Sequence, residues 1–452
     1  MKQLLLKFFL IIGGLIAGTL CVAQQVPVQS PVPSDRFGSS AYDLTDTNQV
    51  NEPEPVTGPL DTLGATQPTA VQAIRSQSVF VGPPAVGATA PAEQKLLRWG
   101  PIIFHPHIGY TFTYGNGIQS SPGQGQKTLV QGVSPGLELD LGRHWTLDYT
   151  PTATFYSDSH FRNTVDHAVS LNGRTVYQDW TLGFSQGCIL TSEPLMETAS
   201  QTDQEDYSTL LDATYQMSTA LSLSLGVAQD FHYLGGFTNT LGSSIGNFRD
   251  WSTMDWLNYQ WSPSLSTSVG AGFGYTAVDI GSDMTYEQVQ GRFIWHLAQK
   301  VSASVSGGAE IRQFLDSGQP DALNPIFSAS LNYQPFKVTT LSLTASRIVR
   351  SSYYQNQATK NTSVNASIRQ RLLGRLYLTL SGGYANTSYQ ASTPGIAINR
   401  EDNYSFFRTD LSTGFLTRAT VSVFYSTSRN SSNMGGFGYS SDQVGFNLAY
   451  RY

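Results

Sequence analysis

The chain has 452 residues, a formal net charge of −6, 13% charged residues and 12% aromatic residues. Because this net charge is mildly acidic and not basic, we expect no nucleic-acid partner. The two cysteines, Cys21 and Cys188, leave no thiolate metal site. The chain is long enough for two or three ordinary domains. Its many Gly, Ser, Thr, Tyr and Phe residues favour strands and turns over helices.

Residues 1–23 have the layout of a secretory signal peptide. Two lysines precede an apolar, glycine-broken run, and Cys-Val-Ala before Gln24 supplies small residues for cleavage. An uncleaved membrane helix fits less well because the apolar run is short. A lipoprotein signal at Cys21 also fits less well, because Leu20 precedes it. We therefore expect Sec-type export, which leaves Cys188 as the one cysteine of the mature chain.

Residues 24–98 differ in composition from everything that follows. The stretches VPVQSPVPSD, NEPEPVTGPLD and VGPPAVGATAPAEQ are rich in proline and small residues and poor in aromatics. Such a segment buries too little apolar surface to offset its ordering entropy, so we predict a disordered, Pro-rich periplasmic tail. The tail is either a spacer or an arm that binds a periplasmic partner.

From Trp99 to Tyr452 the sequence alternates with period two. In SLSLGVAQDFHY, residues 222–233, one face carries leucine, valine and aromatic side chains, and the other carries serine, glycine, aspartate and histidine. This alternation is typical of a strand with one polar and one apolar face. It fits a soluble sandwich and a transmembrane barrel equally well.

The connections distinguish the two folds. Short links such as LGRH, LNGRTV, MSTA, WSPS, LAQK, QPFK, LLGR and LTRA alternate with mostly long polar segments. Tight periplasmic turns and long extracellular loops are typical of outer-membrane barrels. We therefore predict an all-β, antiparallel up-and-down transmembrane barrel of about 18 strands over residues 99–452. Strands are expected to begin near residues 102, 128, 144, 164, 177, 206, 219, 249, 264, 285, 300, 324, 338, 362, 375, 403, 419 and 442. Division of residues 164–190 into two strands is the weakest step, and without it the count is 16.

The last strand carries its own prediction. In VGFNLAYRY, alternate positions are apolar or aromatic: Val444, Phe446, Leu448, Tyr450 and Tyr452. We expect these side chains to face lipid and the strand to pair with the first strand near residues 102–114. A terminal aromatic strand resembles the signal read by the outer-membrane barrel-assembly machinery. Trp145, Trp261, Trp295, Phe336 and Phe415 beside the short links predict an aromatic girdle.

A barrel this wide leaves room for an aqueous channel, whose inward side chains decide what passes. Residues 101–276 contain 15 acidic and 5 basic side chains, a net of −10, whereas residues 277–452 contain 10 and 15, a net of +5. Alternation points charged side chains of both halves inward: Asp140, Asp148, Asp212, Asp230, Arg292, Arg312, Arg369, Arg371 and Arg408. Either the opposed walls set a field across the lumen, or the charges merely solvate a wet interior.

No enzyme is expected, because no short motif marks a nucleophile and its base. His105 and His107 share one strand face, which could hold a metal ion. With no third ligand nearby in sequence, a lumen-facing pair is the favoured interpretation, and we expect no metal and no cofactor.

Three segments carry a family resemblance: GPIIFHPHIGYTFTYGNGI (100–118), VSPGLELDLG (133–142) and LDYTPTATFYSD (147–158). They resemble the opening of the putative beta-barrel porin families, including the outer-membrane barrels associated with exopolysaccharide and PEP-CTERM systems. The resemblance covers residues 99–452. It implies a cell outer-membrane location, a porin-like or polysaccharide-export-associated role, and no catalytic residues.

Three functions follow as hypotheses. The first is a porin-like passive channel for small hydrophilic solutes. The second is an exopolysaccharide export-associated barrel. A ladder of aromatic side chains along the lumen would favour this function, and the inward-facing candidates are scattered: Tyr156, Tyr377, Tyr404, Phe406 and Phe424. The third is a sealed structural or adhesive barrel. Expected partners are outer-membrane lipid and lipopolysaccharide, the assembly machinery and a periplasmic partner of the tail.

Overall fold

The computed structural model describes residues 97–116, 127–192, 194–195, 200–235, 246–297, 300–352, 357–392, 400–416 and 418–452. The predicted signal peptide, and the predicted tail up to residue 96, lie outside these ranges. Within them, no helix is long and apolar enough to span a membrane.

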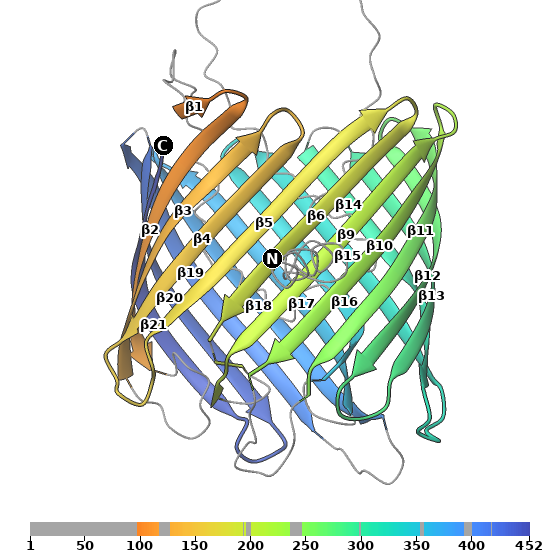
Figure 1. The fold of residues 1–452 in the computed structure, drawn as a ribbon. Helices are drawn as coiled ribbons and strands as arrows, with labels where there is room; N and C mark the ends of the chain where they lie inside the picture. Colours follow the sequence, from red (N-terminus) through yellow and green to blue (C-terminus); the bar gives the residue numbers. More distant parts are fainter. Residues whose placement is uncertain are drawn as a thin grey trace, which may run out of the picture.

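Eighteen antiparallel strands close into one barrel, with strands tilted against the barrel axis (Figure 1). The barrel strands are β2 Ile102–Asn116, β3 Lys127–Leu141, β4 Trp145–Tyr156, β5 Thr164–Tyr177, β6 Trp180–Thr191, β9 Gln204–Gln216, β10 Leu221–Leu234, β11 Phe248–Ser262, β12 Leu265–Val278, β13 Met284–Leu297, β14 Val301–Phe314, β15 Ala322–Phe336, β16 Thr339–Ser351, β17 Gln357–Leu372, β18 Leu376–Ala391, β19 Glu401–Leu416, β20 Ala419–Ser432 and β21 Tyr439–Arg451. Each strand pairs with its neighbours along the chain, which confirms the predicted fold class.

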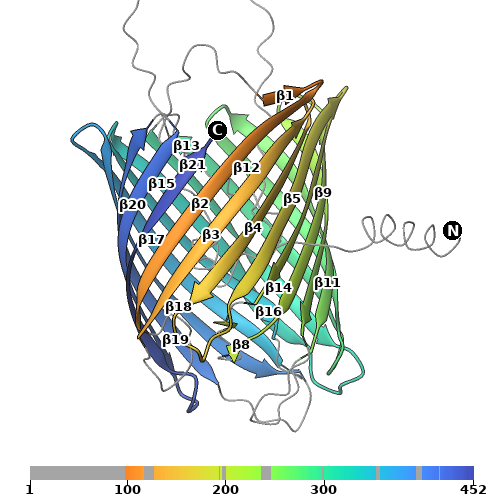
Figure 2. The same cartoon turned by 60° about the vertical axis from the view of Figure 1, so that its left-hand side comes forward.

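Three short strands complete the described structure. β1 (Leu97–Trp99) pairs with the start of β2, and β7 (Pro194–Leu195) pairs with β8 (Ser200–Gln201) between β6 and β9. Figure 2 shows β1 at the same rim as the carboxyl terminus, where the short turns also gather. The first strand among the described residues therefore begins at Leu97, two residues before the predicted start of the barrel.

The barrel closes between the first and last of its strands. β2 pairs with β21 from His107 opposite Arg451 to Asn116 opposite Asp442. The ladder continues past β21, because Tyr452 donates its backbone N–H to the carbonyl of Pro106 at 2.9 Å. The pairing predicted for the last strand is therefore correct, and closure leaves no strand edge open to lipid.

The outer face of the barrel is apolar. Large hydrophobic side chains alternate along the strands with exposed fractions such as 66% for Val269 and 58% for Val423. The predicted girdle residues Trp145, Trp261, Trp295, Phe336 and Phe415 are all exposed on this face. A soluble protein does not expose so continuous an apolar surface, whereas lipid covers it at no cost.

One predicted link is wrong. LNGRTV (171–176) lies inside β5, and the chain turns at Gln178–Asp179, between Tyr177 and its partner Trp180. Asn-Gly is a strong turn signal, but Gly173 is needed for another reason. A Cβ on Gly173 would meet the ring of Trp145 on the neighbouring strand at 2.5 Å from Cζ3. The separate strands β5 and β6 settle the count at 18 and exclude 16.

Candidate functional site

The inner wall of the barrel is polar. Asn258 on β11 donates to Ser224 Oγ on β10 at 2.9 Å and accepts from Ser268 Oγ on β12 at 2.7 Å. Arg292 on β13 donates to the same amide oxygen at 3.0 Å. Four strands are thus joined across their inner faces by side-chain hydrogen bonds, on the side opposite to the lipid-facing hydrophobics.

Arg292 also belongs to a three-layer stack. Trp256 on β11 pairs with Gly270 on β12, and a Cβ on Gly270 would lie 2.6 Å from Trp256 Cε3. The indole therefore lies against the wall, in space that the side chain of any other residue at position 270 would occupy. The Arg292 guanidinium carbon lies 4.2 Å from the indole centroid, in cation–π contact.

A second stack repeats the arrangement one step along the sheet. Tyr286 on β13 covers Gly274 on β12, and the guanidinium of Arg312 on β14 lies 4.7 Å from the Tyr286 ring centroid. Arg312 is also bound by Glu310 through a 2.8 Å ion pair in which both side chains are fully buried. The Tyr286 hydroxyl donates to Asp250 at 2.9 Å.

A third stack lies near the closure of the barrel. Phe424 on β20 covers Gly445 on β21, and the Arg408 guanidinium lies 4.0 Å from the Phe424 centroid. Asp410 lies 3.7 Å from Arg408 in an ion pair. In all three stacks a glycine admits an aromatic ring, and the ring supports an arginine, so the large side chains fold against the wall.

The remaining predicted arginines lie near the rim with the short turns. Arg369 on β17 lies over the ring of Tyr377, 4.6 Å from its centroid. Arg371 donates from Nε to the carbonyl of Gly374 at 2.8 Å, in the turn between β17 and β18. Arg371 therefore stabilises a turn as well as adding positive charge at this rim.

The predicted acidic residues fall into two groups. Asp140 on β3 and Asp148 on β4 face the interior beside the two histidines of β2. His105 Nε2 lies 3.0 Å from Asp140 Oδ2, and His107 Nε2 lies 4.0 Å from Asp148 Oδ2. Thr150 bridges the second pair, lying 3.0 Å from both His107 and Asp148.

Asp212 and Asp230 lie elsewhere on the wall. Asp212 on β9 occupies the space beside Gly183 on β6. Asp230 on β10 is buried at 8% exposure, two residues from His232, which is hydrogen-bonded to Asp206 at 2.5 Å. The acidic side chains therefore do not converge on one place.

Ion pairs within single strands reduce the charge difference predicted between the two halves of the wall. Arg312 and Arg408 have carboxylate partners on their own strands, Glu310 and Asp410, which sequence reasoning missed. Arg400–Asp402 repeats the pattern with a 2.6 Å contact. A signal was present, because residues two apart on a strand share a face and each pair reads as charge–x–opposite charge. Part of the positive charge is thus neutralised within the wall itself.

The aromatic candidates form no exposed ladder. Tyr404 and Phe406 have ring centroids 6.1 Å apart, but Tyr377, Tyr404 and Phe424 are buried, at 9%, 5% and 6% exposure. Their surfaces are covered by neighbouring side chains, as the arginine stacks show for Tyr377 and Phe424. Tyr156 on β4 lies instead beside Phe161, at 5.8 Å between centroids.

The last strand presents its aromatic side to the outside. Val444, Phe446, Leu448, Tyr450 and Tyr452 are exposed by 36–48%. Phe446 stacks on Phe112 of β2 at 5.3 Å between centroids, so outer-face aromatics bridge the closure. Whether this strand is an assembly signal remains a prediction.

The closed antiparallel barrel, apolar outside and polar inside, defines a porin-like protein of the outer membrane. Residues 282–452 match the family described as "Putative beta-barrel porin 2", in agreement with the resemblance seen in the sequence. No curated protein matches the chain significantly.

Among solved structures, the chain is similar to three proteins that are covered over almost their whole length. Pseudomonas aeruginosa OccK11 (OpdR) has 13% identity and a TM-score of 0.39, covering 77% of this chain and 95% of its own. OccK3 (OpdO) of the same organism has 15% identity and a TM-score of 0.41, covering 77% and 95%. The loop L8 deletion mutant of Vibrio cholerae OmpT has 9% identity and a TM-score of 0.33, covering 78% and 99%.

Proposed function

We propose that the protein is a passive channel for small hydrophilic solutes. The observation that carries the proposal is solvent access to charged side chains on the inner wall. Asp140 and Asp148 face only the interior of a closed barrel, yet their side chains are 35% and 31% exposed. Water therefore reaches ionic groups inside the wall, as an aqueous pathway requires.

The three stacks support the same function. An arginine that projected freely could extend several ångströms into the lumen, whereas Arg292, Arg312 and Arg408 lie along the wall on aromatic supports. For Arg292 and Arg408 this arrangement keeps positive charge at the surface of the lumen, whereas Arg312 is buried against Glu310. The centre of the lumen stays clear of all three long side chains. Solutes that carry both a negative and a positive group fit a lumen with Arg292 on β13 and, about half-way round the 18 strands, Asp140 and Asp148 on β3 and β4.

Single-channel recording of the purified full-length protein in a planar bilayer tests the proposal. We expect discrete conductance steps and, in liposome-swelling assays, faster uptake of small zwitterions than of uncharged solutes of equal size. A variant without residues 24–96 tests whether the tail blocks the channel. Absence of conductance from both proteins would overturn the proposal and favour a sealed structural barrel.

A further inference from the structure

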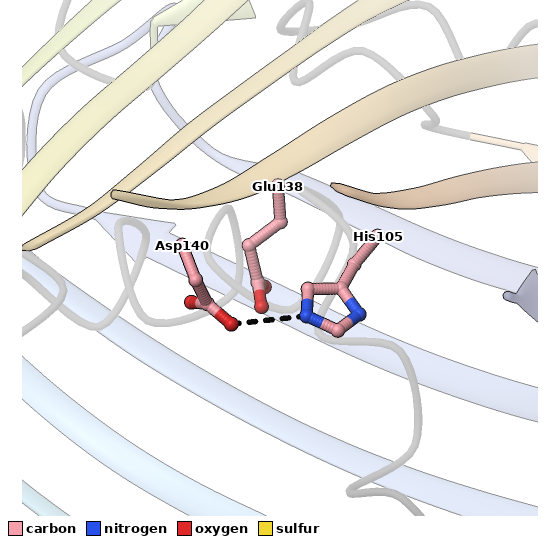
Figure 3. A group of neighbouring side chains, drawn as sticks. All are labelled: His105, Glu138 and Asp140. Carbon is pink, nitrogen blue, oxygen red and sulfur yellow. Dashed lines mark hydrogen bonds and ion pairs between the residues drawn. The ribbon is translucent and has the colours of Figure 1, made fainter. Parts of the chain in front are cut away.

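Three metal-ligating side chains converge at the closure of the barrel, on its inner face. His105 comes from β2, and Glu138 and Asp140 come from β3 (Figure 3). One donor atom from each residue lies within 4.8 Å of the other two. We propose that this His105–Glu138–Asp140 group binds a divalent first-row metal ion that enters from the lumen.

Strand register creates the group. His105 pairs with Glu138 across β2 and β3, and Asp140 is two positions further along the same face. All three side chains point into one space, and the dashed line in Figure 3 marks the 3.0 Å contact between His105 Nε2 and Asp140 Oδ2. Donor atoms around a tetrahedral ion lie about 3.3–3.6 Å apart, given metal–ligand distances of about 2.0–2.2 Å. Small side-chain rotations are enough to reach that spacing.

Outer contacts hold both carboxylates in place. Thr146 Oγ1 donates to Asp140 Oδ1 at 3.3 Å, leaving Oδ2 directed at His105. Arg451 on β21 donates to Glu138 Oε1 at 2.6 Å, which leaves Oε2 for a ligand. Neutral partners such as Thr146 orient metal ligands, and their removal commonly weakens metal binding.

The donor set selects the type of ion. One imidazole and two carboxylates suit Zn²⁺ or Mn²⁺, whereas Mg²⁺ and Ca²⁺ prefer oxygen ligands alone. The three side chains are 20–35% exposed, so an ion can exchange with the lumen and keep water as a further ligand. Because Arg451 is positive and holds Glu138, it opposes metal binding electrostatically.

Equilibrium dialysis of the folded, chelator-treated protein against Zn²⁺ tests the proposal without requiring that the channel conducts. We expect one ion per chain, retained in excess Mg²⁺. His105→Gln and Glu138→Gln should each weaken binding by about 100-fold or more, beyond the usual effect of removing an outer-shell partner. Arg451→Gln should tighten binding by removing the competing charge.

His107→Gln is the matched control, because it changes a histidine on the same strand and face, two residues away, that lies outside the group. Heat-modifiable migration on gels shows that each variant is folded. Wild-type protein that binds no Zn²⁺ would overturn the proposal. So would binding that survives both His105→Gln and Glu138→Gln, or that is lost equally in His107→Gln or in excess Mg²⁺.

Discussion

The Trp256 indole covers Gly270, its partner on the neighbouring strand. A Cβ on Gly270 would lie only 2.6 Å from Trp256 Cε3, so the indole fills the space that a larger residue at position 270 would need. The indole in turn carries Arg292. The absence of a side chain at Gly270 on β12 therefore determines where the charged side chain of Arg292 on β13 lies. The same dependence links Gly274 to Arg312 through Tyr286.

Gly270→Ala is expected to displace Trp256 and Met254, since Met254 Cε would also lie 2.8 Å from the new Cβ. Overpacking of this kind costs about 1–3 kcal/mol. The measurement is the urea midpoint of the heat-modifiable gel shift, together with tryptophan fluorescence. Gly132→Ala is the control, because its nearest neighbour would be 3.8 Å away. Equal midpoints for Gly270→Ala and wild type would contradict the stack as a close-packed unit.

Replacing Arg292 and Arg408 together by alanine should shift selectivity toward cations. Both guanidinium groups lie on the inner wall, so their loss makes the lumen more negative. The reversal potential in a salt gradient measures this change. The double lysine variant keeps both charges and should stay near wild type. An unchanged reversal potential in the double alanine variant would mean that these charges only solvate the wall.

Tyr452→Ser is expected to lower the yield of assembled barrel. The Tyr452 ring is exposed on the outer face, and the Arg418 guanidinium lies 4.1 Å from its centroid. Tyr452→Phe keeps the ring and should assemble normally. Yield is measured as the heat-modifiable fraction in outer-membrane preparations. Normal migration of Tyr452→Ser would argue against the role of this residue as an insertion signal.

The loop before β5 should loosen only in strong acid. Arg162 is ion-paired with Asp203. The Arg162 backbone N–H donates to Gln201 Oε1 at 3.1 Å, and Gln201 Nε2 donates to the Arg162 carbonyl at 3.0 Å. Hydrogen bonds from Ser192, and then Arg162, lower the pKa of Asp203 below its ordinary value. A lowered pKa contributes stability above the ordinary value of about 3.9, and this contribution is lost as the pH falls through the folded-state pKa.

Amide hydrogen exchange of residues 157–163, corrected for intrinsic rates, measures that linkage. Protection should stay constant from neutral pH down to about 4 and fall below it. Asp203→Asn should remove the part of this step that comes from Asp203. The part from Asp158 should remain, since hydrogen bonds from His160 within the loop also lower the pKa of Asp158. Loss of protection already near pH 6 would assign the linkage to another group.

Much of the barrel was predictable, because strand alternation and the alternation of short and long links both follow from its physics. All 18 strands begin within five residues of the predicted positions, and the largest difference is at β17, which begins at Gln357 and not near residue 362. The turn after β5 was not predictable from local sequence, because Gly173 makes room for the Trp145 ring on the neighbouring strand and does not form a turn.

The site was predictable only in part. Period-two alternation places the nine charged residues on the inner-wall face, but it does not say which of them are neutralised. The group of His105, Glu138 and Asp140 depends on the register of β2 against β3, at a point where the partners are more than 30 residues apart in sequence. A shift of that register would change which carboxylates face the histidine.

The closure between β2 and β21 has a kinetic consequence. All other ladders of the barrel join strands that follow one another along the chain, whereas Asp442 donates to Asn116 across 326 positions. This ladder closes by far the longest loop of the barrel and therefore carries the largest single loop-closure entropy. We therefore expect joining of the two end strands to be the slow step of assembly, and its rate to respond to changes in β2 and β21 more than to equal changes in any other pair.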